Sequence, residues 1–387
     1  MLSLKEKISY GLGDFGCNVV FATVSSWFVP FCVSVGVSVE QAGLILFLSK
    51  LVDAICDVCL GIAIDNDQTR IKKLMKVGAA TMAVPLLLLF SAGLFPQSAR
   101  FALLFLLFTL TNSVLYNFFN IPYASLNLAM TSDSKERYSL NVFRMVGSVS
   151  CMTIINIIYP MVDNKLLLYF VCSVVMVLCF IATIKSTKMR VAIKKNPIDF
   201  RYLKSIFFEP SFWLAAAVFF TINFKLNVTM CNIGLNAETV SPGAATMLFM
   251  VPSIAIMLFL PKLLDTEQKK YTALAVALIL DFAAQTLIKE SLLRYAFFGF
   301  ITFPVMSSMI YNLFAKVNDD IYRKTSERLS GLIFATAGII SNLCAGLVGL
   351  FLNRHISLDS ALAAVTVAGA VCAVAILSSL LYQKKTA

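Results

Sequence analysis

The chain of 387 residues is 59% hydrophobic and only 14% charged, and it contains 32 phenylalanines, which excludes an ordinary soluble domain. Its formal charge of +11 does not indicate nucleic-acid binding, because the basic residues are interleaved between long apolar runs instead of lining one face. The ten cysteines are scattered through these runs as small hydrophobic residues, and we expect no disulfides. The composition therefore predicts an all-α protein embedded in the lipid bilayer.

Apolar runs of about 20 residues, separated by short polar loops, predict two sets of six membrane-spanning helices. The first set is expected at residues 8–35, 40–64, 74–94, 101–130, 138–162 and 165–184. The second set is expected at residues 207–234, 243–262, 272–288, 294–317, 328–353 and 359–383. The first run leads directly into the second, so we expect a retained helix and not a signal peptide.

A basic stretch without an apolar run separates the two sets of helices. We therefore predict an N-terminal bundle at 1–184, a cytoplasmic linker at 185–206 and a C-terminal bundle at 207–387. Most of the 32 lysines and arginines lie in the loops on the side of the amino terminus, and the positive-inside rule places that side in the cytoplasm. Both termini are thus expected to be cytoplasmic, in a monomer of the bacterial cytoplasmic membrane.

Two short motifs recur in the same order in both halves. DNDQTRIKK after the second span resembles DTEQKK after the eighth, and SKERYS after the fourth resembles TSERLS after the tenth. Internal repeats of this kind are typical of transporter folds. We expect gating or structural roles for these loop residues and for one cation of the second span, namely Lys50, Asp65, Arg70, Arg137 and Arg328.

The second span contains KLVDAICDVCLG, which sets a cation and two carboxylates in an apolar helix. Lys50, Asp53 and Asp57 are spaced i, i+3 and i+7, so they share one side of the helix. An unpaired charge in the bilayer costs roughly 3 kcal/mol or more, and two carboxylates one turn apart repel each other. The pattern favours a proton or metal-cation site. An ion pair that only fixes packing remains the alternative, whereas Cys56 and Cys59 diverge too far for a good metal site.

Polar side chains also line the first and fourth spans. Asp14 and Asn18 are one turn apart in the first, and the fourth carries Asn117 and Asn120 at similar spacing, followed by Pro122, which favours a kink. Asparagine amides suit ligands with hydroxyl groups, and hydrogen bonds between helices are the competing explanation.

The predicted membrane-embedded charges do not balance. The cations are Lys50, Arg144 and Lys225, and the anions are Asp14, Asp53, Asp57 and Asp281. One additional proton or metal ion would make this set neutral, which favours coupling to an ion gradient. Lys225 has two possible partners, an anionic group of a substrate or one of the aspartates, and the sequence does not identify the partner of Asp281.

Several motifs together resemble one known family. YGLGDFG near the amino terminus, KLVDAICDVCLG, NIPYASL, the ERxSxNxxR pattern at 136–144 and NDDIYRKTSERLSG are similar to the glycoside-pentoside-hexuronide:cation symporters, the melibiose permease group of the major facilitator superfamily. The resemblance implies twelve membrane-spanning helices in two pseudo-symmetric six-helix bundles. It also implies symport of a sugar or glycoside with H⁺ or Na⁺ by alternating access.

The resemblance also implies roles for individual residues. The cation would be held by Asp53 and Asp57, while the family's amide and hydroxyl positions in this site fall on Cys56 and Asn117. The implied sugar positions, with Tyr123 of the same motif and Lys225 added, are Asn18, Asn120, Tyr123, Ala124, Arg144, Lys225 and Asn342. Of the charged positions that the family uses for the sugar, only Arg144 keeps its charge here.

Nothing in the sequence indicates an enzyme, since it has a single histidine, no nucleophile paired with a base and no phosphate-binding loop. We expect no cofactor other than the coupling ion, with a lean toward H⁺ because Cys56 offers no oxygen ligand. The expected partner is a small sugar or glycoside, possibly acidic. The alternative is a carrier of a non-sugar such as a lipid, drug or other organic solute, or a sensor that has lost sugar coupling.

Overall fold

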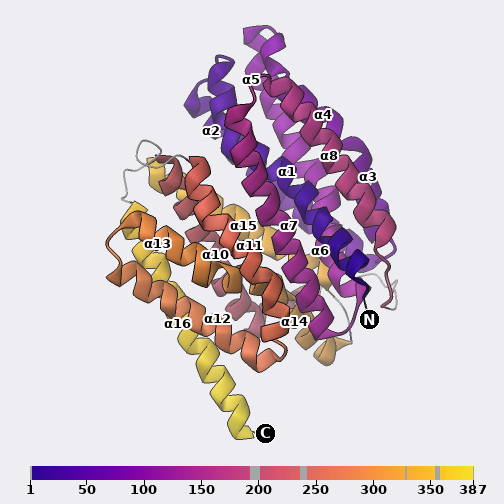
Figure 1. Cartoon of the computed structure of the whole chain (residues 1–387). Coiled ribbons are helices and arrows are strands. Elements are labelled where there is room, and N and C mark those ends of the chain that lie inside the picture. Colours follow the sequence, from indigo (N-terminus) through magenta and orange to yellow (C-terminus); the bar gives the residue numbers. More distant parts are fainter. Residues whose placement is uncertain (1, 192–200, 236–241, 327–328, 354–357, 387) are drawn as a thin grey trace. The chain divides into compact units, whose positions relative to one another are not determined.

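The computed structural model describes residues 2–191, 201–235, 242–326, 329–353 and 358–386, and the regular elements of this part are all helices (Figure 1). Contacts between helices divide the chain into two compact units. Unit 1 comprises Met1–Ser132, Ser150–Ile198 and Leu329–Ile339, and unit 2 comprises Asp133–Val149, Asp199–Arg328 and Ile340–Ala387. Two helices, α7 and α15, therefore contribute to both units.

Unit 1 contains most helices of the first half of the chain. They are α1 (Leu4–Ser34), α2 (Val39–Asn66), α3 (Arg70–Thr81), α4 (Ala83–Phe90), η1 (Ala92–Leu94), α5 (Gln97–Phe108), η2 (Thr109–Leu115), α6 (Tyr116–Met130), the end of α7 (Ser134–Met161), α8 (Lys165–Ser186) and the first turns of α15 (Ser330–Asn353). Helix α1 packs along α8, and α2 packs against η2 and α6. The polar positions of α2 and α6 are thereby brought together.

Unit 2 contains the first part of α7, the rest of α15 and the other helices of the second half. These are α9 (Arg201–Phe207), α10 (Pro210–Leu235), α11 (Pro242–Leu263), α12 (Glu267–Leu287), α13 (Ser291–Phe297), η3 (Phe298–Thr302), α14 (Phe303–Thr325) and α16 (Leu358–Thr386). Helix α16 packs against α12 and α10, and α10 also contacts α14. The later part of α15 joins this core, because Cys344 packs with Phe224 and Val228 of α10.

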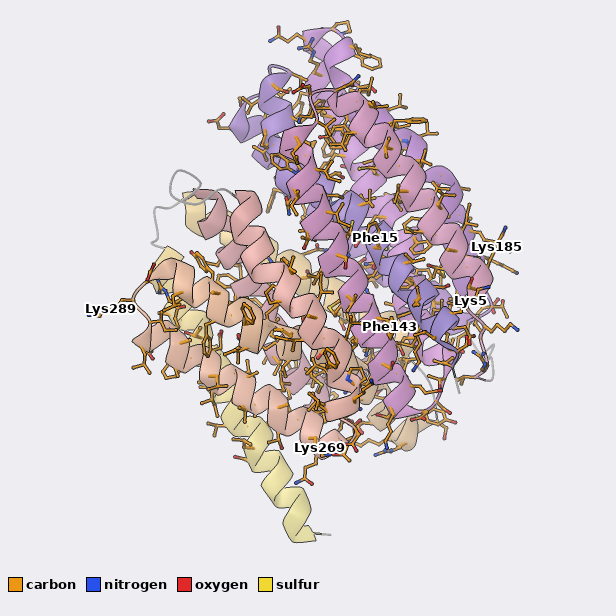
Figure 2. The ribbon with its side chains drawn as sticks, viewed as in Figure 1. Lys5, Phe15, Phe143, Lys185, Lys269 and Lys289 are labelled. Atoms are coloured by element: carbon orange, nitrogen blue, oxygen red, sulfur yellow. The ribbon has the colours of Figure 1, made fainter. Side chains whose placement is uncertain are left out.

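The described residues include eight helical runs that are long and apolar enough to cross a membrane. Three shorter apolar helices lie at Met250–Leu263, Ser330–Cys344 and Ala363–Ser378. With α2, which carries more charge, these runs account for the twelve predicted spans. Their ends are marked by exposed cations, such as Lys5, Lys185, Lys269 and Lys289 in Figure 2.

Helix α2 has an exposed apolar face and a buried polar face. Phe47, Leu51 and Ile55 follow one another at intervals of four residues and are exposed, which suits contact with lipid tails. Ser49, Asp53 and Asp57 lie on the opposite face and are buried in unit 1. The face that would be costly in lipid is therefore turned toward protein.

Capping signals set where the first two helices begin. Ser3 with Glu6 and Ser38 with Gln41 form complete capping boxes, in which each side chain bonds the other residue's backbone N–H. Between these helices the chain turns at Gly36, whose φ of 80° favours glycine. This turn reverses the chain between α1 and α2.

The predicted fourth and tenth spans each contain a π-helical segment, η2 and η3, that periodicity did not predict. The predicted linker at 185–206 includes the short helix α9, and its residues 192–200 lie outside the described part. The SKERYS motif, predicted before the fifth span, forms the first turns of α7. Such boundary differences arise because polar residues extend helices beyond the apolar run.

Candidate functional site

The Asp53 carboxylate of α2 is fully partnered inside unit 1. The Lys50 ammonium lies 2.9 Å from its Oδ2, and Asn117 of α6 donates from Nδ2 to its Oδ1 at 2.5 Å. The Lys50 side chain is 30% exposed, whereas Asp53 is buried. Lys50 therefore forms its ion pair with Asp53, the nearer of the two carboxylates along the helix.

The π-helical segment η2 positions this contact. The Ser113 hydroxyl donates to the Ser49 carbonyl of α2 at 2.9 Å, and Asn117 also donates to the Ser113 carbonyl at 3.0 Å. A π-helical turn shifts the helical register locally and is common at functional sites. Here it brings a hydroxyl and an amide of the fourth span onto the buried face of α2.

Asp57 lies one turn beyond Asp53 and has a different environment. Its side chain is buried, with 2% of the residue exposed, and its Oδ1 has no hydrogen-bond partner. The neighbouring Cys56 is less buried, and its thiol offers a sulfur in place of an oxygen ligand. A buried oxygen without a partner next to a satisfied carboxylate is the arrangement expected where a proton or a small cation binds.

The first turns of α15 cover this side of α2. The Asp65 carboxylate accepts hydrogen bonds from the backbone N–H groups of Gly331 and Leu332 at 2.6 and 2.8 Å, and so caps the start of α15. Gly61 lies against Gly331, since a Cβ on Gly61 would meet the Gly331 oxygen at 2.9 Å. The structural role predicted for Asp65 thus corresponds to a specific contact within unit 1.

Four of the residues predicted to bind substrate belong to unit 1. The Asn18 amide donates to the Asp14 carbonyl at 2.8 Å and to its carboxylate at 3.2 Å. Tyr123 is fully buried, stacks on Tyr10 with 4.6 Å between ring centroids, and donates its hydroxyl to the Tyr10 carbonyl at 2.6 Å. Ala124 is buried and Asn120 is partly exposed. Tyr123 therefore bonds α1 to α6 in this structure.

The other three, Arg144, Lys225 and Asn342, belong to unit 2. The Arg144 guanidinium is 2% exposed and lies 3.6 Å from the centroid of the Tyr311 ring, a cation–π contact between α7 and α14. Asn342 is partly exposed on α15. The planar guanidinium of Arg144 can form two parallel hydrogen bonds, a geometry that suits recognition of a planar anion such as a carboxylate.

Lys225 has a partner that the sequence did not identify. Its ammonium forms an ion pair with Asp281 of α12 and lies 4.7 Å from the centroid of the Phe298 ring. The Thr302 hydroxyl of η3 donates to the other Asp281 oxygen at 3.2 Å. The two charges thus compensate each other in a buried site, as membrane-embedded charges usually do.

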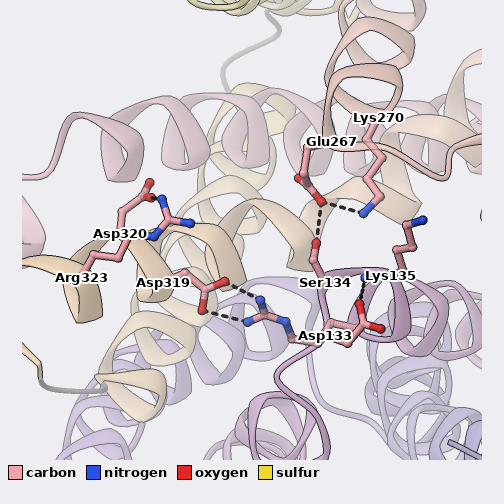
Figure 3. A network of polar contacts seen from close by, with 9 residues as sticks. Asp133, Ser134, Lys135, Glu267, Lys270, Asp319, Asp320 and Arg323 are labelled. Atoms are coloured by element: carbon pink, nitrogen blue, oxygen red, sulfur yellow. Dashed lines mark hydrogen bonds and ion pairs between the residues drawn. The ribbon is translucent and has the colours of Figure 1, made fainter. Parts of the chain in front are cut away.

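Charged residues at the start of α7 form a network within unit 2 (Figure 3). Arg137 binds both carboxylate oxygens of Asp319 on α14, one of them at 2.9 Å. Ser134 and Lys270 both contact Glu267, at 2.5 and 2.7 Å. Among the other predicted gating residues, Arg70 lies 3.6 Å from Asp67, and Arg328 lies outside the described residues.

The described residues contain no group of three or more His, Cys, Asp or Glu side chains that is arranged to hold a metal ion. The oxygen-bearing side chains of this part of α2 and α6 are the Asp53 and Asp57 carboxylates and the Asn117 amide, and oxygen ligands suit hard cations.

Apolar helical spans with charged side chains buried inside them are typical of integral membrane transporters. The chain matches the family described as MFS/sugar transport protein over residues 9–358, and it belongs to this family. The predictions of a major facilitator fold, and of a transporter in place of an enzyme, are thereby confirmed.

Individual relatives support the predicted resemblance to cation symporters. The uncharacterized symporter YjmB of Bacillus subtilis (strain 168) is 28% identical over 296 residues, which is 70% of this chain and 64% of that protein. The inner membrane symporter YicJ of Escherichia coli (strain K12) is 29% identical over 177 residues, 43% of this chain and 38% of YicJ. The isoprimeverose transporter of Lactiplantibacillus pentosus is 30% identical over 167 residues, 42% and 35% of the respective chains. The matches thus span less than two thirds of each relative.

A solved structure supports the fold. It is the crystal structure of a bacterial homologue of the iron transporter ferroportin in an outward-facing state, with a TM-score of 0.69 and 12% identity. The likeness covers 97% of this chain and 100% of that chain. At this identity it shows the common fold and carries no information on the substrate.

Proposed function

We propose that the protein is a secondary active transporter that couples the movement of a sugar or glycoside to that of a cation, by alternating access between an N-terminal bundle at 1–184 and a C-terminal bundle at 207–387. The observation that carries the coupling is Asp57, a buried carboxylate whose Oδ1 has no hydrogen-bond partner beside a fully partnered Asp53. A single bound cation would remove the cost of burying that charge.

The coupling ion is proposed to be H⁺, with Na⁺ as the competing ion. A proton needs only one carboxylate oxygen, which Asp57 offers, whereas Na⁺ needs several oxygen ligands. Asn117 donates its amide group to Asp53 and to the Ser113 carbonyl, so its Oδ1 is the one oxygen that its side chain could offer to Na⁺, and Cys56 brings no oxygen. The names of the relatives support cation coupling in general, because several are described as symporters.

The substrate is proposed to be a sugar derivative with an acidic group. Arg144 is the buried cation proposed to bind this group through its planar guanidinium, which stacks on Tyr311, whereas Lys225 forms an ion pair with Asp281. Asn18, Asn120 and Asn342 would bond the sugar hydroxyls, with Ala124 offering no ring for stacking. If these amides instead serve only packing, the protein carries a non-sugar solute or acts as a sensor.

The setting proposed for this function is a monomer in a bacterial cytoplasmic membrane with both termini in the cytoplasm. The support is the excess of basic residues on the side of the amino terminus and the description of YicJ as an inner membrane symporter.

Calorimetric binding to the purified protein tests the substrate and the ion together. Hexuronides and neutral galactosides are titrated with and without Na⁺ at two pH values, on the wild type and on Arg144→Lys. We expect tighter hexuronide binding at the lower pH, and a loss of about tenfold or more in Arg144→Lys, which is about 1.4 kcal/mol. Tight galactoside binding that requires Na⁺ and ignores pH would contradict both assignments.

A further inference from the structure

The start of α15 runs back along one face of α2 inside unit 1. Asp57, Gly61 and Asp65 are spaced i, i+4 and i+8 and therefore share that face. At one end Asp65 caps the first turn of α15, and in the middle the Gly61 backbone lies on Gly331. The capping contact fixes the start of α15 on the same helix that carries Asp57.

At the other end of this face α15 presents Gly338 to Asp57. A Cβ atom on Gly338 would lie 2.5 Å from Asp57 Oδ2, closer than non-bonded atoms approach, and 3.3 Å from its Cγ, which is a tight contact. A side chain at this position would therefore displace the Asp57 carboxylate, whereas glycine lets the α15 backbone lie directly against it. Since the Asp57 Oδ1 is also buried without a hydrogen-bond partner, this oxygen has lost water and gained no hydrogen bond in exchange.

We propose that Gly338 is a positioning residue for the coupling cation. Because Gly338 has no side chain, α15 can close over Asp57. Cation binding to Asp57 and docking of α15 on α2 then favour each other. This inference rests on the proposed function, in which Asp57 carries the cation. A bare carboxylate under a helix is costly, and a bound cation removes that cost. By linkage, docking of α15 strengthens cation binding by the same factor by which the cation strengthens docking.

The boundary between the two units falls inside α15, just after the segment that covers Asp57. Residues Leu329–Ile339 of α15 belong to unit 1, and the residues from Ile340 onward belong to unit 2. The segment that covers Asp57 is therefore continuous with a helix of the other unit. A cation that holds this segment on α2 acts on an element common to both units.

The test compares Gly338→Ala with Gly43→Ala, a matched control on α2 where a Cβ would meet nothing within 4 Å. The readout is the thermal unfolding midpoint of purified protein against Na⁺ concentration at fixed pH, and against pH without Na⁺. We expect Gly338→Ala to need an at least tenfold higher concentration of the stabilising cation to reach half of the maximal rise in the unfolding midpoint. Gly43→Ala should need the same concentration as the wild type. A role in packing alone would lower the midpoint without changing that concentration.

A double-mutant cycle tests the contact itself and covers the case in which Gly338→Ala folds poorly. Asp57→Ser shortens the side chain and removes the clash, so Gly338→Ala should cost much less stability in the Asp57→Ser background. An equal cost in both backgrounds would overturn the contact. A double variant that folds as poorly as Gly338→Ala would do the same.

The outcomes for the two proposals are separable. If Asp57→Ser abolishes the cation response while Gly338→Ala retains the wild-type half-saturating concentration, the inference about Gly338 fails and the proposed function stands. If Asp57→Ser keeps the full cation response, Asp57 does not carry the cation and the proposed function itself is contradicted.

Discussion

Asp53 and Asp57 have the same side chain, the same helix and the same buried face, yet their partners differ. Asp53 has a lysine and an amide, while the Oδ1 of Asp57 has no hydrogen-bond partner. The difference arises from what the neighbouring elements present: η2 and α6 bring Asn117 to Asp53, whereas α15 brings a glycine to Asp57. Asp53 thus has its partners within unit 1, and Asp57 is the carboxylate that we propose takes the cation.

The buried pair of Lys225 and Asp281 gives a prediction about stability. Lys225→Met leaves Asp281 uncompensated and should destabilise the protein by about 3–5 kcal/mol, whereas the double variant Lys225→Met/Asp281→Leu should recover most of that loss. Thermal or denaturant unfolding in detergent measures both. If the double variant were as unstable as Lys225→Met, the loss of stability would not come from leaving the Asp281 charge uncompensated.

The same variants separate a structural role of Lys225 from a role in substrate binding. A stable double variant that binds hexuronides as the wild type does assigns Lys225 to structure. A stable double variant that has lost hexuronide binding assigns it to the substrate, as the sequence also allowed.

At the scale of the element, much of the site could be predicted from the sequence because helical periodicity is local. The spacing of Lys50, Asp53 and Asp57 predicted one shared face. In α2 both aspartates are buried on the side opposite the exposed Phe47 and Ile55, and Lys50 is partly exposed. The contacts made by α15 could not be predicted in this way. They depend on which helix packs on α2, and Gly338 alone carries no signal that it faces a carboxylate.

The π-helical segments η2 and η3 were missed for a related reason. An extra residue in one helical turn shifts the register by a single position, and periodicity read over a mostly apolar span does not reveal so small a shift, so the sequence predicts a plain α-helix. Their positions matter to both buried charge sites, because η2 carries Ser113 and η3 carries Thr302. The partner of Asp281 depends on tertiary packing and was likewise beyond the sequence.

The cap at the start of α15 gives a prediction at this scale. Asp65→Ala removes a carboxylate that accepts two backbone N–H groups and should cost about 2 kcal/mol of stability, with Asp65→Asn intermediate. Asp163→Ala, which removes an exposed loop carboxylate, is the control and should be near neutral. Thermal unfolding measures the series, and an Asp65→Ala midpoint equal to that of the control would argue against the cap.

At the scale of the whole molecule, the basic loops predict the orientation in the membrane. In a variant without native cysteines, Arg190→Cys should react with an impermeant thiol reagent only from the cytoplasmic side. Asp163→Cys, on the other side of α8, should react only from outside. The opposite pattern at both positions would reverse the topology.

The central claim is that Asp57 carries the coupling cation, and uptake into proteoliposomes tests it most directly. The labelled sugar that binds in calorimetry is supplied outside, and an inward H⁺ or Na⁺ gradient is imposed. The wild type should accumulate the sugar above its external concentration. Asp57→Asn should only equilibrate the sugar across the membrane, because the neutral amide no longer binds the coupling cation. Accumulation by Asp57→Asn at the wild-type level would contradict the claim.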